Sequence, residues 1–164
     1  RPGDALIVQF GHNDEKDDPA RHTDPQSTYP ETLARYCEAA KAAGALPVLV
    51  TPVCRRYFLN DGNLLYTHGE YPAAVRALAA RLSVPLCDLN RASREMYLRL
   101  GPAETAKLFV RLSPGENPAY PQGHDDLTHF NAGGAGRIAA LAAEEMALDP
   151  RCRAYIRTTE GKER

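Results

Sequence analysis

Three apolar runs stand out along the chain. Residues 5–10, 46–51 and 84–89 are almost continuously apolar, and Gly11 and Pro52 close the first two runs. Short apolar runs without polar alternation are typical of strands that are buried on both faces of a parallel sheet. The pattern therefore predicts three buried strands.

Four segments carry apolar residues at helical spacing instead. Helices are predicted over residues 30–43, 71–82, 91–100 and 133–146. Within the first, Pro30 suits an opening turn, and Gly44 suits the stop that follows it. Strands that alternate with helices in this order predict an α/β fold, a three-layer doubly wound parallel sheet with right-handed crossovers.

The sheet is short for this architecture. A doubly wound domain usually has about five strands, and the pattern provides about three. We therefore expect the fold to be incomplete at its N-terminal side, with two further strands before residue 1. Residues 1–150 are then the C-terminal portion of a single domain, and residues 151–164 are a C-terminal tail.

Composition and charge limit the partners. The 164 residues carry a formal net charge of −1, with acidic and basic side chains interspersed. This balance provides no broad basic field, so we expect neither nucleic acid nor a membrane as a partner. No apolar run approaches the roughly 20 residues of a membrane-spanning helix. Residues 1–4 do not begin a signal peptide, but a signal could precede them, so a cytoplasmic and a secreted location both remain open.

The cysteines are widely spaced and include no CxxC pair, which argues against a zinc module. Burial as free thiols is the expected state, because that is the usual fate of unpaired cysteine. A disulfide is the alternative. The four residues are Cys37, Cys54, Cys87 and Cys152.

The loop after the first predicted strand is the first candidate site, because functional loops lie at the carboxyl ends of parallel strands. Gly11 lets the backbone turn sharply out of the strand. Asn13 offers a neutral amide donor that can face a developing oxyanion. A plain turn, with Asn13 bonded to its own backbone, explains the same residues. The polar stretch 15–24 that follows is predicted to be a surface lid or loop.

Asp126 and His129 form the second candidate site. An acid three residues before a histidine can fold back within one turn and accept from Nδ1–H, which leaves Nε2 as a general base. A helix-capping aspartate or a solvated histidine explains the spacing equally well. A metal hydrolase that uses His12, His124 and His129 is a further alternative, but such a site needs additional ligands, and we expect no metal or organic cofactor.

Arg55 and Arg56 follow the second predicted strand at the same edge of the sheet. Two neighbouring guanidinium groups can bind a carboxylate in a bidentate manner. A solvated loop is the alternative. The pair is therefore a candidate binding site for an anionic group of a substrate.

Together these segments resemble the SGNH/GDSL hydrolases, and within them the rhamnogalacturonan acetylesterases. The matching residues, in chain order, are Pro2-Gly3-Asp4, Val8-Gln9-Phe10-Gly11-His12-Asn13-Asp14, Thr51-Pro52-Val53, Arg55-Arg56, Phe58, Thr67-His68-Gly69, Tyr71-Pro72, Ala74-Val75, Val84-Pro85-Leu86, Asp88-Leu89-Asn90, Asp126, Thr128-His129-Phe130 and Gly134-Ala135. The resemblance implies that Asn13, after the turn at Gly11, donates to the oxyanion hole. It also implies that Asp126 and His129 are the acid and base of a catalytic triad.

One element of that family is absent from these 164 residues. Its nucleophilic serine lies in a Gly-Asp-Ser block, but here Gly3-Asp4 is followed by Ala5. A glycine block that gives another oxyanion donor is also absent. The serines that are present lack this context and are better explained as loop or capping hydroxyls. They are Ser27, Ser83, Ser93 and Ser113.

The resemblance implies a serine esterase that, joined to an upstream part, removes acetyl groups from a plant cell-wall polysaccharide such as rhamnogalacturonan. The expected partner is an acetylated polysaccharide or oligosaccharide, and Arg55 and Arg56 would recognise a galacturonate carboxylate. The alternative is a truncated remnant or pseudoenzyme that at most binds carbohydrate or a partner.

Overall fold

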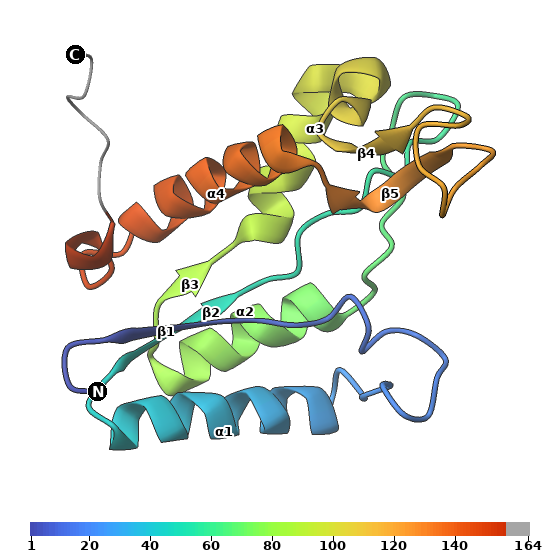
Figure 1. The fold of residues 1–164 in the computed structure, drawn as a ribbon. Coiled ribbons are helices and arrows are strands. Elements are labelled where there is room, and N and C mark those ends of the chain that lie inside the picture. Colours follow the sequence, from blue (N-terminus) through green and yellow to red (C-terminus); the bar gives the residue numbers. More distant parts are fainter. Residues whose placement is uncertain (157–164) are drawn as a thin grey trace, which may run out of the picture.

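The computed structural model describes residues 1–156, in which strands and helices alternate before a C-terminal hairpin and helix (Figure 1). The elements are β1 (Ala5–Gln9), α1 (Thr28–Ala42), β2 (Leu46–Val50), α2 (Tyr71–Leu82), β3 (Leu86–Cys87), α3 (Leu89–Ala106), β4 (Phe109–Leu112), β5 (His124–Phe130), α4 (Ala132–Ala147) and the 3₁₀ helix η1 (Arg153–Tyr155).

The first three strands form one parallel sheet in the order β1-β2-β3. Helices α1 and α2 cover one face, and α3 and α4 lie on the other (Figure 1). Successive side chains of β2 point to opposite faces, as a strand requires. Leu49 packs with α1 and α2, whereas Val48 and Val50 pack with α3 and α4. The predicted three-layer α/β arrangement with a parallel sheet is therefore confirmed.

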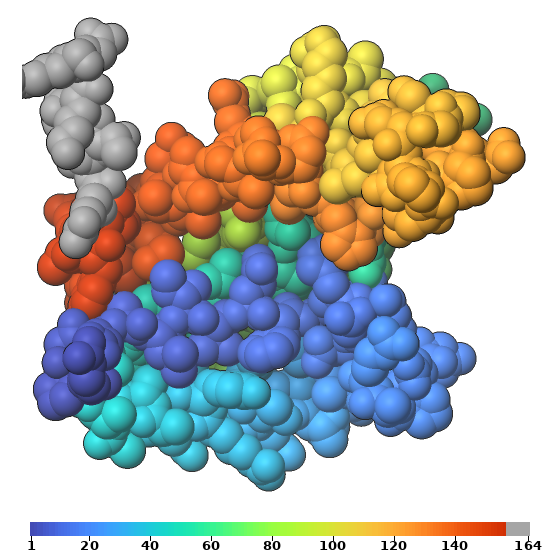
Figure 2. Space-filling view, in the orientation of Figure 1, coloured from blue at the N-terminus to red at the C-terminus, as the bar shows by residue number. Residues whose placement is uncertain are grey.

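Strand β1 lies at the edge of this sheet and pairs only with β2 among the described strands. Figure 2 shows it as a blue strip at the surface between α4 and α1. Val8 faces α1 and is buried, but Ile7, which pairs with Val48 and shares its face, is 56% exposed. Leu6 and Phe10, which lie on the same face as Val8, are also exposed, whereas Ile7 lies on the face of α3 and α4. The α3/α4 face of the sheet is thus open along β1.

The third strand and the helix after it differ from their predicted bounds. The strand predicted over 84–89 is only Leu86–Cys87, because Asp88 caps α3 by accepting from the Arg91 amide. The helix predicted over 91–100 runs on to Ala106 across a kink. Gly101 has a φ of 72° at the kink, and Pro102 after it lacks the amide hydrogen that a regular helix would use.

The hairpin of β4 and β5 was not predicted from the sequence. The two strands pair in antiparallel fashion, with a register shift between Phe109 and Arg111. The rings of Phe109 and Phe130 lie 4.7 Å apart and join the hairpin to the core. Asp126 and His129, which precede the last helix, therefore lie within a strand.

All four cysteines are buried free thiols, as predicted. Of the predicted tail, Cys152 packs in the core, and residues 157–164 lie outside the described residues. None of the helices in residues 1–156 is both long and apolar enough to cross a membrane.

Candidate active site

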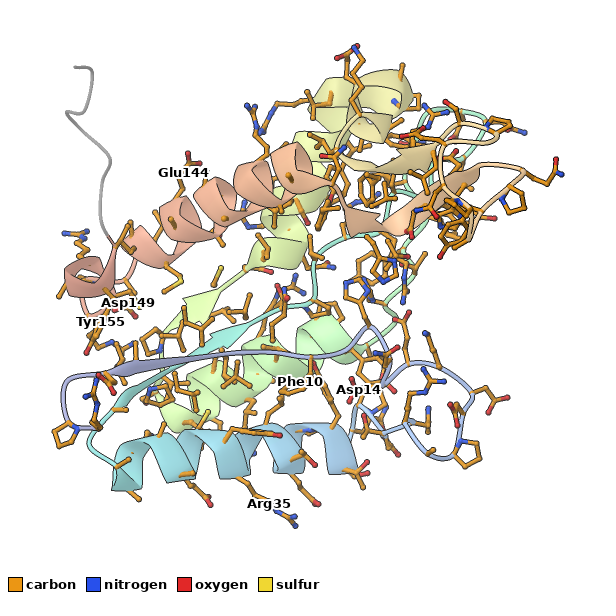
Figure 3. All side chains as sticks on the ribbon, in the orientation of Figure 1. Phe10, Asp14, Arg35, Glu144, Asp149 and Tyr155 are labelled. Carbon is orange, nitrogen blue, oxygen red and sulfur yellow. The ribbon has the colours of Figure 1, made fainter. Side chains whose placement is uncertain are left out.

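The loop after β1 makes a tight turn that requires glycine. Gly11 has a φ of 122°, and a Cβ there would lie 3.0 Å from a side-chain carbon of Pro52. The Gly11 amide donates to Asp14 Oδ2 at 2.9 Å, which closes the turn. Figure 3 labels Asp14 in this loop, at the end of β1 that lies toward β5. The predicted turn residue therefore stands at the carboxyl edge of the sheet.

Asn13 projects from this turn and is exposed. Asp14, and not Asn13, makes the hydrogen bond from side chain to backbone that defines the turn. Within residues 1–156, the amide group of Asn13 makes no hydrogen bond to the protein. The alternative in which Asn13 serves its own backbone is thus not what the structure shows, and its amide is available to a ligand.

Asp126 and His129 are in direct contact. Asp126 Oδ2 accepts from His129 Nδ1 at 2.7 Å, and Oδ1 accepts from the amides of Thr128 and His129 at 2.6 and 2.7 Å. Asp126 is not a helix cap, since Asn131 caps α4 by accepting from Gly134. The His129 side chain is 79% exposed. Asp126 is therefore placed to orient the ring, with Nε2 left toward solvent.

Hydrogen bonds keep Asp126 ionised. Burial alone would raise the pKa of Asp126, but the donors from His129 and Thr128, together with Nε2 of His124 at 3.3 Å, outweigh it and hold the pKa well below its usual range. A carboxylate that stays charged favours the imidazolium that a general base forms when it takes a proton. The electrostatics suit an acid–base pair.

The Gly11–Asn13 loop and the Asp126–His129 pair lie in one site. Burial, followed by the charges of His68, Arg55 and His129, lowers the pKa of His12 to about 3, so His129 lies near enough to His12 to affect its charge. The chain after β2 contacts both segments, because Arg55 donates to the His12 carbonyl and the Arg56 amide donates to the Leu127 carbonyl.

Arg55 and Arg56 are engaged with the protein. Arg55 pairs with Glu15 and donates to the His12 carbonyl at 2.9 Å, and Arg56 donates to Asp125 Oδ1 at 2.7 Å. Their side chains are only 17% and 10% exposed. Neither arginine belongs to a solvated loop. Recognition of a substrate carboxylate by the pair stays a prediction, and it would require each guanidinium group to share or release a partner.

Two residues of the site had no role in the sequence interpretation. Glu15, assigned to a surface lid, has a side chain only 14% exposed, and its Oε2 lies 2.7 Å from Nδ1 of the buried His68. The Nε2 atom of His68 lies 2.9 Å from the Val53 carbonyl. The run Thr67-His68-Gly69 was a matching segment in the family resemblance, and this was the available signal for His68.

The described part of the chain provides neither a nucleophile bonded to His129 nor a cluster of metal ligands. In residues 1–156, no serine, threonine or cysteine side chain is hydrogen-bonded to the His129 ring. Ser93 is buried and donates to the Leu89 carbonyl at 2.6 Å. No group of three or more histidine, cysteine, aspartate or glutamate side chains is arranged to hold a metal within these residues.

Comparison with known proteins decides the family. The family model of the GDSL-like lipase/acylhydrolases matches residues 1–137. The chain belongs to this family. It is 43% identical over 164 residues to the rhamnogalacturonan acetylesterase RhgT of Bacillus subtilis (strain 168). This match covers 98% of the chain and 68% of RhgT. It is 37% identical to the probable rhamnogalacturonan acetylesterase YesY of the same organism, and this match covers 87% of the chain and 62% of YesY.

Two solved structures share the fold of this chain. The crystal structure of YxiM from Bacillus subtilis matches with a TM-score of 0.73 and 28% identity, over 90% of this chain and 38% of that protein. The acetyl-xylooligosaccharide esterase Axe2 from Geobacillus matches with a TM-score of 0.60 and 19% identity, over 94% of this chain and 62% of Axe2. The resemblance seen in the sequence is confirmed at the level of the family. The GDSL chain spans roughly two thirds of the length of its two acetylesterase relatives, 68% and 62%.

Proposed function

We propose that this GDSL chain supplies the general base, its orienting acid and an oxyanion donor to a serine acetylesterase that acts on an acetylated carbohydrate. The observation that carries the proposal is the 2.7 Å contact of Asp126 Oδ2 with His129 Nδ1, which leaves Nε2 of the exposed ring open. Asn13, with a free amide on the neighbouring loop, complements the pair.

The reaction follows from these parts and a serine outside these residues. The serine hydroxyl attacks the acetyl carbonyl, and His129 Nε2 takes its proton. The Asn13 amide stabilises the negative oxygen of the tetrahedral intermediate. Collapse of the intermediate expels the sugar oxygen, which receives the proton from His129. Water then attacks the acetyl-enzyme in the same way, releases acetate and restores the serine.

The open edge of β1 supports an upstream contribution. Ile7 and Leu6 expose apolar side chains, and one edge of β1 has no strand beside it in the described residues. Such edges are normally covered in native proteins. Two upstream strands would extend the sheet from this edge, and the first, leading into a Gly-Asp-Ser turn, would bring the serine to the carboxyl end of the sheet.

The proposed substrate rests on the relatives. RhgT is a rhamnogalacturonan acetylesterase, YesY is a probable one, and Axe2 is an acetyl-xylooligosaccharide esterase. An acetyl ester on a polysaccharide or oligosaccharide is common to all three names. Acetylated rhamnogalacturonan is the first candidate because RhgT and YesY share more sequence identity with the chain than Axe2 does.

The test uses the protein extended upstream of Arg1. Acetate release from acetylated rhamnogalacturonan and from a chromogenic acetate ester should be measured for the extended protein, for its upstream Ser→Ala variant and for residues 1–164 alone. Only the extended protein should turn over. Turnover by residues 1–164 would place the nucleophile within this chain, and no turnover by any of the three would favour the non-catalytic alternative.

A further inference from the structure

We infer that Arg55 and Arg56 are positioning residues that fix the oxyanion loop relative to the acid–base pair. Arg55 holds the loop that carries Asn13, and Arg56 holds the strand that carries Asp126 and His129. Because the two arginines are adjacent, a single backbone segment after β2 sets the distance between the two halves of the site. The catalytic consequence of this arrangement rests on the proposed function.

Arg55 is fastened on both sides of Asn13. One nitrogen of its guanidinium group donates to the His12 carbonyl at 2.9 Å, and another pairs with the Glu15 carboxylate. Asn13 therefore lies between two anchor points that share one rigid, planar group. This restricts the backbone at Asn13 while its side chain remains exposed and free of protein partners.

Glu15 is itself held by the buried His68. Its second carboxylate oxygen lies 2.7 Å from His68 Nδ1, and His68 is 2% exposed. The opposite ring nitrogen of His68 contacts the Val53 carbonyl at 2.9 Å, two residues before Arg55. Burying a carboxylate is costly unless it is paired, and here both oxygens have partners. The cluster joins the loop after β1 to the segment after β2.

Arg56 acts on the other half of the site. Its guanidinium group donates to Asp125 Oδ1 at 2.7 Å and to the Asp126 carbonyl at 3.4 Å, and it lies 5.5 Å from the centre of the Phe109 ring. The Arg56 amide donates to the Leu127 carbonyl at 3.2 Å. Arg56 therefore holds the Asp125 side chain and the carbonyl groups of Asp126 and Leu127.

Arginine is required for both tasks. A guanidinium group offers several donors in a fixed plane, so it can serve a carboxylate and a carbonyl together, whereas a lysine ammonium is a point charge on a flexible stem. Arg55→Lys and Arg56→Lys would keep the charge but lose this shared geometry. A misplacement of about 1 Å in a catalytic group can cost up to a hundredfold in rate.

Substrate recognition is the rival role, and the kinetic constants separate the two. If the arginines bind a galacturonate carboxylate, Lys variants should raise KM on rhamnogalacturonan and leave an uncharged chromogenic acetate ester unaffected. If they position the site, kcat should fall about tenfold to a hundredfold on both substrates, with KM little changed.

The experiment compares Arg55→Lys and Arg56→Lys with Arg76→Lys in the extended protein. Arg76 is a matched control, because its guanidinium group makes two 2.9 Å hydrogen bonds to Asp88 without contacting either half of the site. We expect kcat of the control to stay within about twofold of wild type. Glu15→Gln tests the loop half in a second way if Arg55→Lys does not fold. A rise in KM confined to rhamnogalacturonan would overturn the inference.

Double-mutant cycles locate the effect. Added to Asn13→Ala, Arg55→Lys should reduce kcat little further, whereas Arg56→Lys should act with its full effect. Full additivity of Arg55→Lys with Asn13→Ala would contradict positioning through Asn13. If Asn13→Ala itself leaves kcat unchanged, the proposed function fails at the oxyanion donor.

Amide hydrogen exchange tests the positioning role without a measurement of enzyme activity. Exchange in residues 11–15 should rise in Arg55→Lys and stay unchanged in Arg76→Lys. Unchanged exchange in Arg55→Lys would overturn the loop half of the inference, whatever the fate of the proposed function.

Discussion

Gly134 lies so close to the carbonyl oxygen of Leu108 that a Cβ at Gly134 would be 1.8 Å from that oxygen. This contact packs the first turn of α4 against the chain just before β4. The cap of α4, Asn131, also donates to the carbonyls of Lys107 and Phe109, at 2.8 and 3.1 Å. The end of β5 is therefore fixed two residues after His129.

The Gly134→Ala substitution should consequently destabilise the extended protein. The added methyl group meets backbone that cannot move like a side chain, so we expect a loss of about 1–3 kcal/mol or more in the free energy of unfolding. Gly136 is the matched control, since a Cβ there meets nothing within 4 Å. Gly136→Ala should stabilise α4 by about 0.5–1 kcal/mol. Denaturant unfolding measures both, and equal stability of the two variants would show that the close approach is absent.

The His129→Ala substitution should remove the general base. We expect kcat for acetyl ester hydrolysis to fall by about 10² to 10⁴-fold, the usual contribution of general acid–base catalysis. Stability should change little, because the side chain is 79% exposed. The exposed His22, in the loop after β1, provides a control in His22→Ala. A rate near wild type in His129→Ala would remove this residue from the mechanism.

The Asp126→Asn substitution should leave His129 in place but with the wrong tautomer. An amide at this position can donate to Nδ1, so the ring proton of His129 then sits on Nε2. A general base needs a free lone pair on Nε2. In a Ser-His-Asp triad this change lowers kcat by about 10⁴-fold. Steady-state kinetics measure the rate, and NMR of the His129 ring nitrogens reports the tautomer. An unaltered tautomer together with a full rate would contradict the orienting role of Asp126.

His12 should make the protein less stable in mild acid. Burial, followed by the charges of His68 and Arg55, lowers the pKa of His12 to about 3 in the folded state. An unfolded histidine has a pKa of about 6.5, so between these values the unfolded chain binds the extra proton. The contribution of His12 to stability is complete above about pH 6.5 and is lost as the pH falls toward about 3. In His12→Phe, the free energy of unfolding should decrease less steeply over this range. An identical slope in the variant would show that His12 titrates normally.

The helices and strands that could be predicted from the sequence are those with strong local patterns. The apolar runs at β1 and β2, and the helical spacing of α1, α2 and α4, are properties of adjacent residues and survive in the fold. The hairpin of β4 and β5 is different. Strand β5 alternates between partly buried and exposed residues, but most of its side chains are polar, so no apolar pattern marks it in the sequence. The position of the hairpin depends on the contact between Phe109 and Phe130, which are distant in sequence.

The same distinction holds for the site. Gly11, Asn13, Asp126 and His129 could be selected from the sequence, because their chemistry depends on short spacings and on the ends of strands. The sequence alone could not show that Glu15 is held by Arg55 and by a histidine 53 residues away, or that Arg55 and Arg56 point to opposite halves of the site. Charged side chains are ordinarily solvated. Tertiary packing removes this water and places each buried charge beside a partner of opposite charge or a carbonyl group, and the sequence does not specify that partner.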